Sequence, residues 1–107
     1  MLPVIYMPVA EKYFKKLKEK KLKDTFKEAI MSIRKNPDIG YAKSGDLSGI
    51  YCLDIYYNQT NYELAYRISH LENGDMVVII MAGTRESHNI TAFLFLFSFR
   101  ISLFSNT

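Results

Sequence analysis

The chain has 107 residues, of which 49% are hydrophobic and 23% are charged, which indicates one folded domain and excludes a disordered chain. Its single cysteine, Cys52, excludes an internal disulfide and indicates a reducing compartment, the cytoplasm. One cysteine and two histidines argue against a Cys/His metal cage, so we expect no metal or cofactor. No apolar stretch reaches the length of a membrane span and the N-terminus lacks the basic start of a secretory signal, so we expect no membrane partner.

Positive charge is concentrated in residues 11–35. This segment holds ten Lys and Arg against four Asp and Glu, a net charge of +6, while the whole chain carries +3, so the remainder carries −3. A basic segment of this kind suits a nucleic acid or an acidic partner protein. It is also typical of a lysine-rich helical surface that is simply exposed to water.

The first half of the chain is predicted to form a short strand followed by two helices. Residues 2–7 are apolar and flanked by prolines, which indicates an edge strand that ends where a helix can begin. In residues 9–35 the apolar positions form two faces that would point to opposite sides of one straight helix. A break near residues 19–21 would let both faces meet one core, so we expect a helical hairpin that ends before Pro37.

The second half is predicted to form an antiparallel meander after a loop over residues 38–48. Residues 50–57 and 62–69 alternate apolar and polar side chains, as strands buried on one face do. The continuous apolar run of residues 76–82 follows an Asn-Gly turn signal and is expected to be a central strand buried on both faces. With the helices covering one face of this sheet, the predicted fold class is α+β.

A four-residue turn at residues 58–61 would set the pairing of the first two strands of the meander. Tyr57 would then lie opposite Tyr62. In the third strand, Ile79 and Met81 are expected to face the helices. The other face of the sheet would carry a small polar group of side chains, which are Cys52, Asp54, Tyr56, Glu63 and Arg67. Polar side chains grouped on an otherwise apolar sheet are typical of a functional site.

The last segment of the chain differs in composition from the rest. Phenylalanine alternates with other residues from 93 to 99, and Arg100 is the only charged residue in 90–107. This pattern favours a strand, which would have to pack on the core, pair with another chain or be covered by a partner. We therefore expect a main unit over residues 1–86 and an atypical apolar tail of the same domain over residues 87–107.

Several short motifs resemble the RelE/ParE superfamily of bacterial toxins from toxin–antitoxin systems. In chain order they are AEKYFKKL (residues 10–17), AI (29–30), NP (36–37), GDLSGIY (45–51), YRI (66–68) and GTRE (83–86). Their order and spacing fit over residues 1–86, about four-fifths of the chain. The family plan of one strand, two helices and three strands agrees with the elements predicted above.

The resemblance implies a small basic toxin that a co-expressed antitoxin holds inactive. RelE-like members of the family cleave mRNA on the ribosome without a metal, and ParE-like members poison DNA gyrase. Cleavage of RNA requires that a 2′-hydroxyl lose its proton, that positive charge meet the phosphorane, and that the leaving 5′-oxygen receive a proton. The candidate residues follow from the positions that match the family.

Three of these candidates lie on or after the predicted sheet. Arg85 matches the family arginine that faces the phosphate, or else it forms a surface ion pair with an acid such as Glu86. The arginine that RelE-like enzymes carry at the start of the third strand falls on Glu63, which could act as a base but would repel a phosphate. Arg67 points to the same face and could replace that arginine, or it pairs with Asp54 or Glu63.

Three further candidates lie where the chain departs from the family or outside its motifs. The lysines that some RelE-like members carry on the second strand fall on Cys52 and Asp54, so Lys43 is the nearest substitute or else a solvated side chain. Tyr56 is the only aromatic residue clearly on the polar face, so it is a candidate for binding the substrate, although one aromatic does not form the stacking platform of RNA-binding proteins. Ser-His-Asn stands where the family continues into a helix with a tyrosine, so His88 is a candidate proton donor or an ordinary loop histidine.

Several functions therefore stay open. The first is a ribosome-dependent mRNA endonuclease, whose partners are the ribosome and mRNA; the second is a ParE-like inhibitor of DNA gyrase; the third is a homologue that retains only antitoxin binding. A fourth, outside the toxin class, is RNA binding without cleavage. For the endonuclease the catalytic residues would be Arg85, Arg67, His88 and Glu63, and the substrate-binding residues Lys43 and Tyr56. Every toxin hypothesis predicts a cognate acidic antitoxin that lies along this chain as a helix or an added strand.

Overall fold

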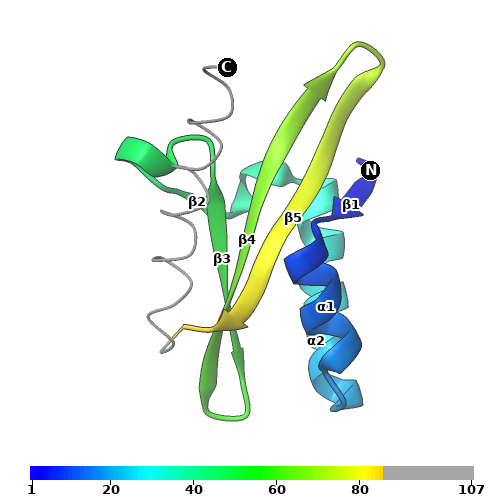
Figure 1. The fold of residues 1–107 in the computed structure, drawn as a ribbon, viewed down its shortest axis with the longest axis vertical. Coiled ribbons are helices and arrows are strands. Elements are labelled where there is room, and N and C mark those ends of the chain that lie inside the picture. Colours follow the sequence, from blue (N-terminus) through cyan, green and yellow to red (C-terminus); the bar gives the residue numbers. More distant parts are fainter. Residues whose placement is uncertain (86–107) are drawn as a thin grey trace.

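The computed structural model describes residues 1–85 as one sheet with two helices on one of its faces (Figure 1). In chain order the elements are β1 Val4–Tyr6, α1 Pro8–Lys16, α2 Lys20–Lys35, β2 Tyr41–Ala42, β3 Tyr51–Tyr57, β4 Thr60–Leu71 and β5 Gly74–Thr84. The strand order is β1-β5-β4-β3-β2, in which β1 runs parallel to β5 and every other pair is antiparallel. The predicted α+β fold is confirmed, with β2 as an additional short edge strand. The predictions for Glu86, His88 and the apolar tail fall on residues that lie outside the described range.

The helical hairpin breaks at residues 17–19, close to the predicted position. Leu17 and Glu19 have extended backbones at the end of α1 and the start of α2. The break turns the apolar side of each helix toward the same face of the sheet, where Ala10 of α1 and Phe26 of α2 are buried in one core. Pro8 occupies the first turn of α1, where its missing N–H costs little.

The hairpin between β3 and β4 turns on two residues, so the predicted four-residue turn is wrong. Asn58 and Gln59 both have positive φ angles, of 49° and 65°, which is the backbone of a tight two-residue turn. Tyr57 consequently pairs with Thr60 and not with Tyr62. Because side chains alternate with a period of two, this slip of two residues leaves each side chain on its predicted face.

Strand β5 contains a bulge that the sequence pattern does not reveal. Ala65 pairs with Met81 and Tyr66 pairs with Ile79, so Ile80 is an extra residue in β5. Ile79 faces the helices as predicted, but Met81 lies on the opposite face, because the extra residue reverses the alternation. The reversal helps to form a second, smaller apolar cluster on the face away from the helices, made of Leu47, Ile50, Cys52, Ala65, Ile80 and Met81.

The predicted hairpin before the central strand is confirmed, but its two-residue turn is Glu72-Asn73, one residue before the predicted Asn73-Gly74. Leu71 pairs with Gly74, and the β4–β5 hairpin projects beyond the rest of the sheet (Figure 1). Within residues 1–85, neither helix has the length and apolar character needed to cross a membrane.

Candidate functional site

Six polar side chains gather on the sheet face opposite the helices, and we call them the charge cluster. Its members are Tyr41, Lys43, Cys52, Asp54, Glu63 and Arg85. The pairing of β3 with β4 makes Asp54 and Glu63 direct cross-strand neighbours. Arg85 follows β5, and its backbone N–H donates to the carbonyl of Asn61 at 2.8 Å, which fixes the start of its side chain beside β4.

Glu63 is the buried centre of the charge cluster, with 4% of its surface exposed. Its Oε1 lies 3.8 Å from Nζ of Lys43 and accepts a hydrogen bond of 3.3 Å from the hydroxyl of Tyr41. The thiol of Cys52 is also hydrogen-bonded to this carboxylate. Burial, followed by the bond to Glu63, raises the pKa of the Cys52 thiol above its ordinary value, so the thiol stays protonated at neutral pH.

Asp54 and Arg85 form the open side of the charge cluster. Nη1 of Arg85 donates to Oδ2 of Asp54 at 2.9 Å, and 55% and 40% of the two side chains are exposed. The Tyr41 hydroxyl lies 3.5 Å from the other oxygen, Oδ1, and its single hydrogen can serve Asp54 or Glu63 at one time. Burial, followed by the charge of Glu63, raises the pKa of Tyr41, so this hydroxyl remains a donor at neutral pH.

The charge cluster therefore holds two cations and two carboxylates in two ion pairs, Arg85 with Asp54 at 2.9 Å and Lys43 with Glu63 at 3.8 Å. A guanidinium can bind an anion in a fork, a carboxylate can accept a proton, and a phenolic hydroxyl can pass one on. Acid–base chemistry on an anionic substrate is what these groups can perform. In the described part of the chain, no three His, Cys, Asp or Glu side chains converge in a way that could hold a metal ion.

The structure brings Arg85, Glu63 and Lys43 together and sets Arg67 apart from them. Arg67 lies four residues beyond Glu63 on β4, which is about 13 Å along an extended strand. Its Nη1 donates to Oγ of Ser69 at 2.6 Å, so neither the predicted pairing with a carboxylate of the cluster nor a contact with Arg85 is seen.

Two other residues complete the comparison with the predicted site. Tyr56 lies on β3 with 67% of its surface exposed, so its ring is open to a ligand. Tyr41, a central member of the cluster, was not predicted, because residues 38–48 show no periodicity from which the two-residue strand β2 could be recognised.

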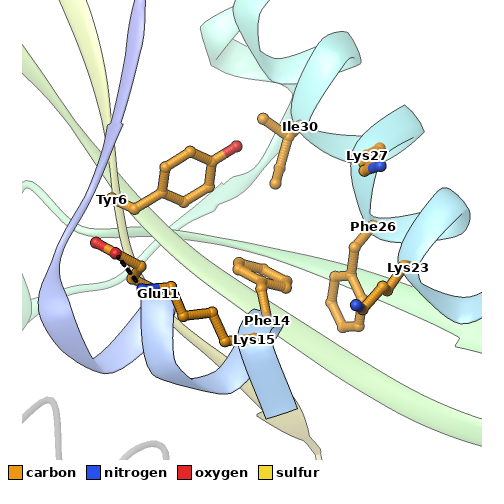
Figure 2. A pocket seen from close by; sticks show the side chains of 8 residues that line it. All are labelled: Tyr6, Glu11, Phe14, Lys15, Lys23, Phe26, Lys27 and Ile30. Carbon is orange, nitrogen blue, oxygen red and sulfur yellow. Dashed lines mark ion pairs between the residues drawn. The ribbon is translucent and has the colours of Figure 1, made fainter. Parts of the chain in front are cut away.

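A second feature, on the helix side of the molecule, is an apolar groove of about 330 Å³ between β1, α1 and α2. We call it the helix groove. Its floor is formed by Tyr6, Phe14, Phe26 and Ile30, and its rim by Glu11, Lys15, Lys23 and Lys27. Phe14 packs edge-on against both Tyr6 and Phe26, with ring centres 6.0 and 5.3 Å apart (Figure 2). Glu11 is paired with Lys15 at 3.0 Å, which leaves the rim with a net positive charge.

Comparison with protein families identifies the class. Residues 4–90 match the family described as the ParE-like toxin of type II bacterial toxin–antitoxin systems. The match covers about four-fifths of the chain, so the chain belongs to this family and is the toxin of a type II toxin–antitoxin system. The resemblance to the RelE/ParE superfamily that the motifs indicate is therefore confirmed.

Three solved structures share the fold. A double mutant of the E. coli toxin RelE in the free state has 18% identity and a TM-score of 0.64, and the match covers 85% of this chain and 90% of that one. The toxin–antitoxin complex RelBE2 of Mycobacterium tuberculosis has 24% identity and a TM-score of 0.59, covering 78% and 98%. A YoeB/ParE toxin from Agrobacterium tumefaciens has 11% identity and a TM-score of 0.64, covering 78% and 99%. No curated protein matches this sequence.

Proposed function

We propose that this toxin is an endoribonuclease that cleaves mRNA on the ribosome without a metal. The observation that supports the proposal is the grouping of Arg85, Lys43 and Glu63 on one sheet face, where the Arg85 side chain is 55% exposed. A guanidinium and an amine can compensate the charge of a phosphorane, and a carboxylate beside them can take a proton. The ribosome would supply much of the positioning of the RNA, so that few residues are needed.

The proposed reaction moves one proton at each end of the phosphodiester. The 2′-oxygen attacks phosphorus while its proton passes to Glu63, through the Tyr41 hydroxyl that lies 3.3 Å from Oε1. Arg85 and Lys43 compensate the charge of the phosphorane. The bond from phosphorus to the 5′-oxygen then breaks, and the 5′-oxygen takes a proton, for which His88 is the proposed donor. The products are a 2′,3′-cyclic phosphate and a 5′-hydroxyl end.

The remaining candidates are proposed to hold the RNA and not to react with it. Tyr56 offers an exposed ring on which a base can stack. Arg67, set about 13 Å along β4 from Glu63, is too far to meet the same phosphorus and is proposed to contact the RNA backbone.

The test is cleavage of a defined mRNA in a purified bacterial translation system. We expect new 5′ ends within ribosome-occupied codons, and a loss of about 100-fold in cleavage rate for Arg85→Ala. Glu63→Gln should also slow cleavage, while Lys35→Ala, at an exposed position outside the charge cluster, should not. Uncut mRNA beside an active control toxin would contradict the proposal.

A second candidate function, inhibition of DNA gyrase, is favoured by the charge balance of the charge cluster. Asp54 and Glu63 offset Arg85 and Lys43, and a face without net charge suits a protein target better than a polyanion. A DNA supercoiling assay with purified gyrase tests this alternative. Failure of both assays, with antitoxin binding retained, would indicate a catalytically weakened homologue.

We further propose that an acidic segment of the cognate antitoxin fills the helix groove. The groove combines an apolar floor with the lysines Lys15, Lys23 and Lys27, which suits an amphipathic helix that carries Asp and Glu beside its apolar face. The neighbouring edge strand β1 exposes Ile5 and Tyr6, and it could also take an added strand. The proposed location of toxin, antitoxin and target is the cytoplasm, where mRNA and ribosomes are found.

A further inference from the structure

Asp54 occupies the position at which a substrate phosphate would bind Arg85. Both oxygens of this carboxylate have partners, since Oδ2 lies 2.9 Å from Nη1 of Arg85 and Oδ1 lies 3.5 Å from the Tyr41 hydroxyl. A carboxylate and a phosphate are alternative acceptors for the same face of a guanidinium. The Nη1 N–H group that binds Asp54 is therefore not free to bind RNA at the same time.

The rest of the charge cluster does not supply a free cation in place of Arg85. Lys43 is directed at Glu63, with 3.8 Å between Nζ and Oε1, and only 22% of its side chain is exposed. Glu63 and Asp54 are cross-strand neighbours, so an entering phosphate meets two carboxylates on adjacent strands. An anion that binds Nη1 of Arg85 must therefore displace Asp54.

We propose that Asp54 is an internal competitor that sets how strongly Arg85 holds a phosphate of single-stranded RNA. This inference rests on the proposed function, because it assumes that the charge cluster receives RNA. In this role Asp54 sets specificity. It weakens binding of RNA that reaches Arg85 without other contacts, and it is displaced by RNA that other contacts already hold in place. The pair is solvent-exposed, so the substrate can displace the carboxylate without unfolding any element.

The test measures binding and not cleavage, with an oligoribonucleotide whose 2′-hydroxyls are methylated. Asp54→Asn keeps the shape of the side chain and removes its charge. We expect it to tighten binding about two- to fivefold at low salt, the range set by a surface ion pair. We also expect the slope of log affinity against log salt to steepen by about 0.7, which corresponds to one additional phosphate contact on a single strand.

Two variants control for the identity of the cation and for total charge. In the Arg85→Ala background, Asp54→Asn should give no further gain, because the cation that it releases is absent. Asp75→Asn removes the same charge at the distant end of the sheet, where Asp75 pairs with His70 at 2.8 Å, and it should not change the binding. An equal gain from Asp75→Asn, a gain that persists without Arg85, or no binding by any variant would each overturn the inference.

Cleavage assays on the same proteins separate this inference from the proposed function. If Asp54→Asn tightens binding through Arg85 but none of the proteins cuts mRNA on the ribosome, the inference stands and the nuclease function fails. If the wild-type protein cuts mRNA and Asp54→Asn leaves binding unchanged, the function stands and the inference fails.

Discussion

The hydroxyl of Tyr66, on β4, joins the segment after α2 to the sheet by two hydrogen bonds. The side chain is fully buried; its hydroxyl donates to the carbonyl of Pro37 at 2.7 Å and accepts from the N–H of Gly40 at 3.0 Å. Gly40 has no room for a larger residue, because an added Cβ would lie 2.6 Å from this hydroxyl and 2.9 Å from the carbonyl of Cys52. The segment leads directly to β2, so Tyr66 helps to position Tyr41 in the charge cluster.

The first prediction concerns this hydroxyl. Tyr66→Phe should lower the free energy of unfolding by about 1 to 3 kcal/mol, because it leaves the Gly40 N–H and the Pro37 carbonyl without their partner. Urea unfolding followed by circular dichroism measures the change. Tyr56→Phe, whose ring is exposed, is the matched control and should change stability by less than about 0.5 kcal/mol. Equal effects of the two substitutions would contradict this role of Tyr66.

The second prediction concerns pH and Cys52. The folded protein raises the pKa of this buried thiol, whose ordinary value is 9.0, so its contribution to stability is complete below pH 9.0 and is lost as the pH rises. Above that pH the unfolded chain releases the proton and the folded chain keeps it, which lowers the free energy of unfolding by up to about 1.4 kcal/mol per pH unit. Urea titrations from pH about 8 to about 10 should show a steeper decline for the wild-type protein than for Cys52→Ala. Equal declines of stability for the two proteins would contradict the assignment of this pH dependence to Cys52.

Residue by residue, strand alternation predicted that Asp54 and Glu63 share one face of the sheet, and a family motif drew attention to Arg85. Lys43 was named only as the nearest lysine in the preceding loop. The sequence was not sufficient to find Tyr41, which lies in a two-residue strand without periodicity. It also left open whether Arg67 joins the others, because that depends on how far the side chain reaches along β4. The structure shows the Arg67 guanidinium on Ser69.

At the scale of elements, the helical hairpin was predictable and the details of the sheet were not. Two apolar faces on opposite sides of residues 9–35 can meet one core only if the helix breaks, and the break is observed at residues 17–19. The positive φ angles of Asn58 and Gln59 and the bulge at Ile80 have no such signal in the sequence. Asn-Gln is a weaker turn signal than Asn-Gly, and a continuous apolar run carries no alternation that a bulge could interrupt.

The third prediction tests the helix groove as the docking site of the antitoxin. Lys23→Glu combined with Lys27→Glu should weaken binding of the cognate antitoxin about tenfold or more, because the rim would then repel an acidic segment. Isothermal titration calorimetry at two salt concentrations measures the affinity and shows how far salt weakens it. Lys35→Glu is the control, since Lys35 is an exposed lysine of α2 outside the groove. An antitoxin that binds the double variant as tightly as the wild-type toxin must dock elsewhere.

At the scale of the whole molecule, the helix groove and the charge cluster lie on opposite faces of the sheet. The groove is built by the two helices and β1. Figure 1 shows the two helices on one side of the sheet, and the charge cluster belongs to the other face. An antitoxin helix confined to the groove would therefore leave Arg85 open. We expect an inhibitory antitoxin to extend around an edge of the sheet, and a fragment that fills only the groove to bind without blocking the activity.

The measurement that tests the central claim most directly is the mapping of mRNA 5′ ends in bacteria after brief induction of the toxin without its antitoxin. A nuclease acting on the ribosome predicts new ends within translated codons for the wild-type protein, and none for an equally abundant Arg85→Ala variant that still binds the antitoxin. Growth arrest without new mRNA ends, or new ends that persist with Arg85→Ala, would contradict the catalytic role proposed for the charge cluster.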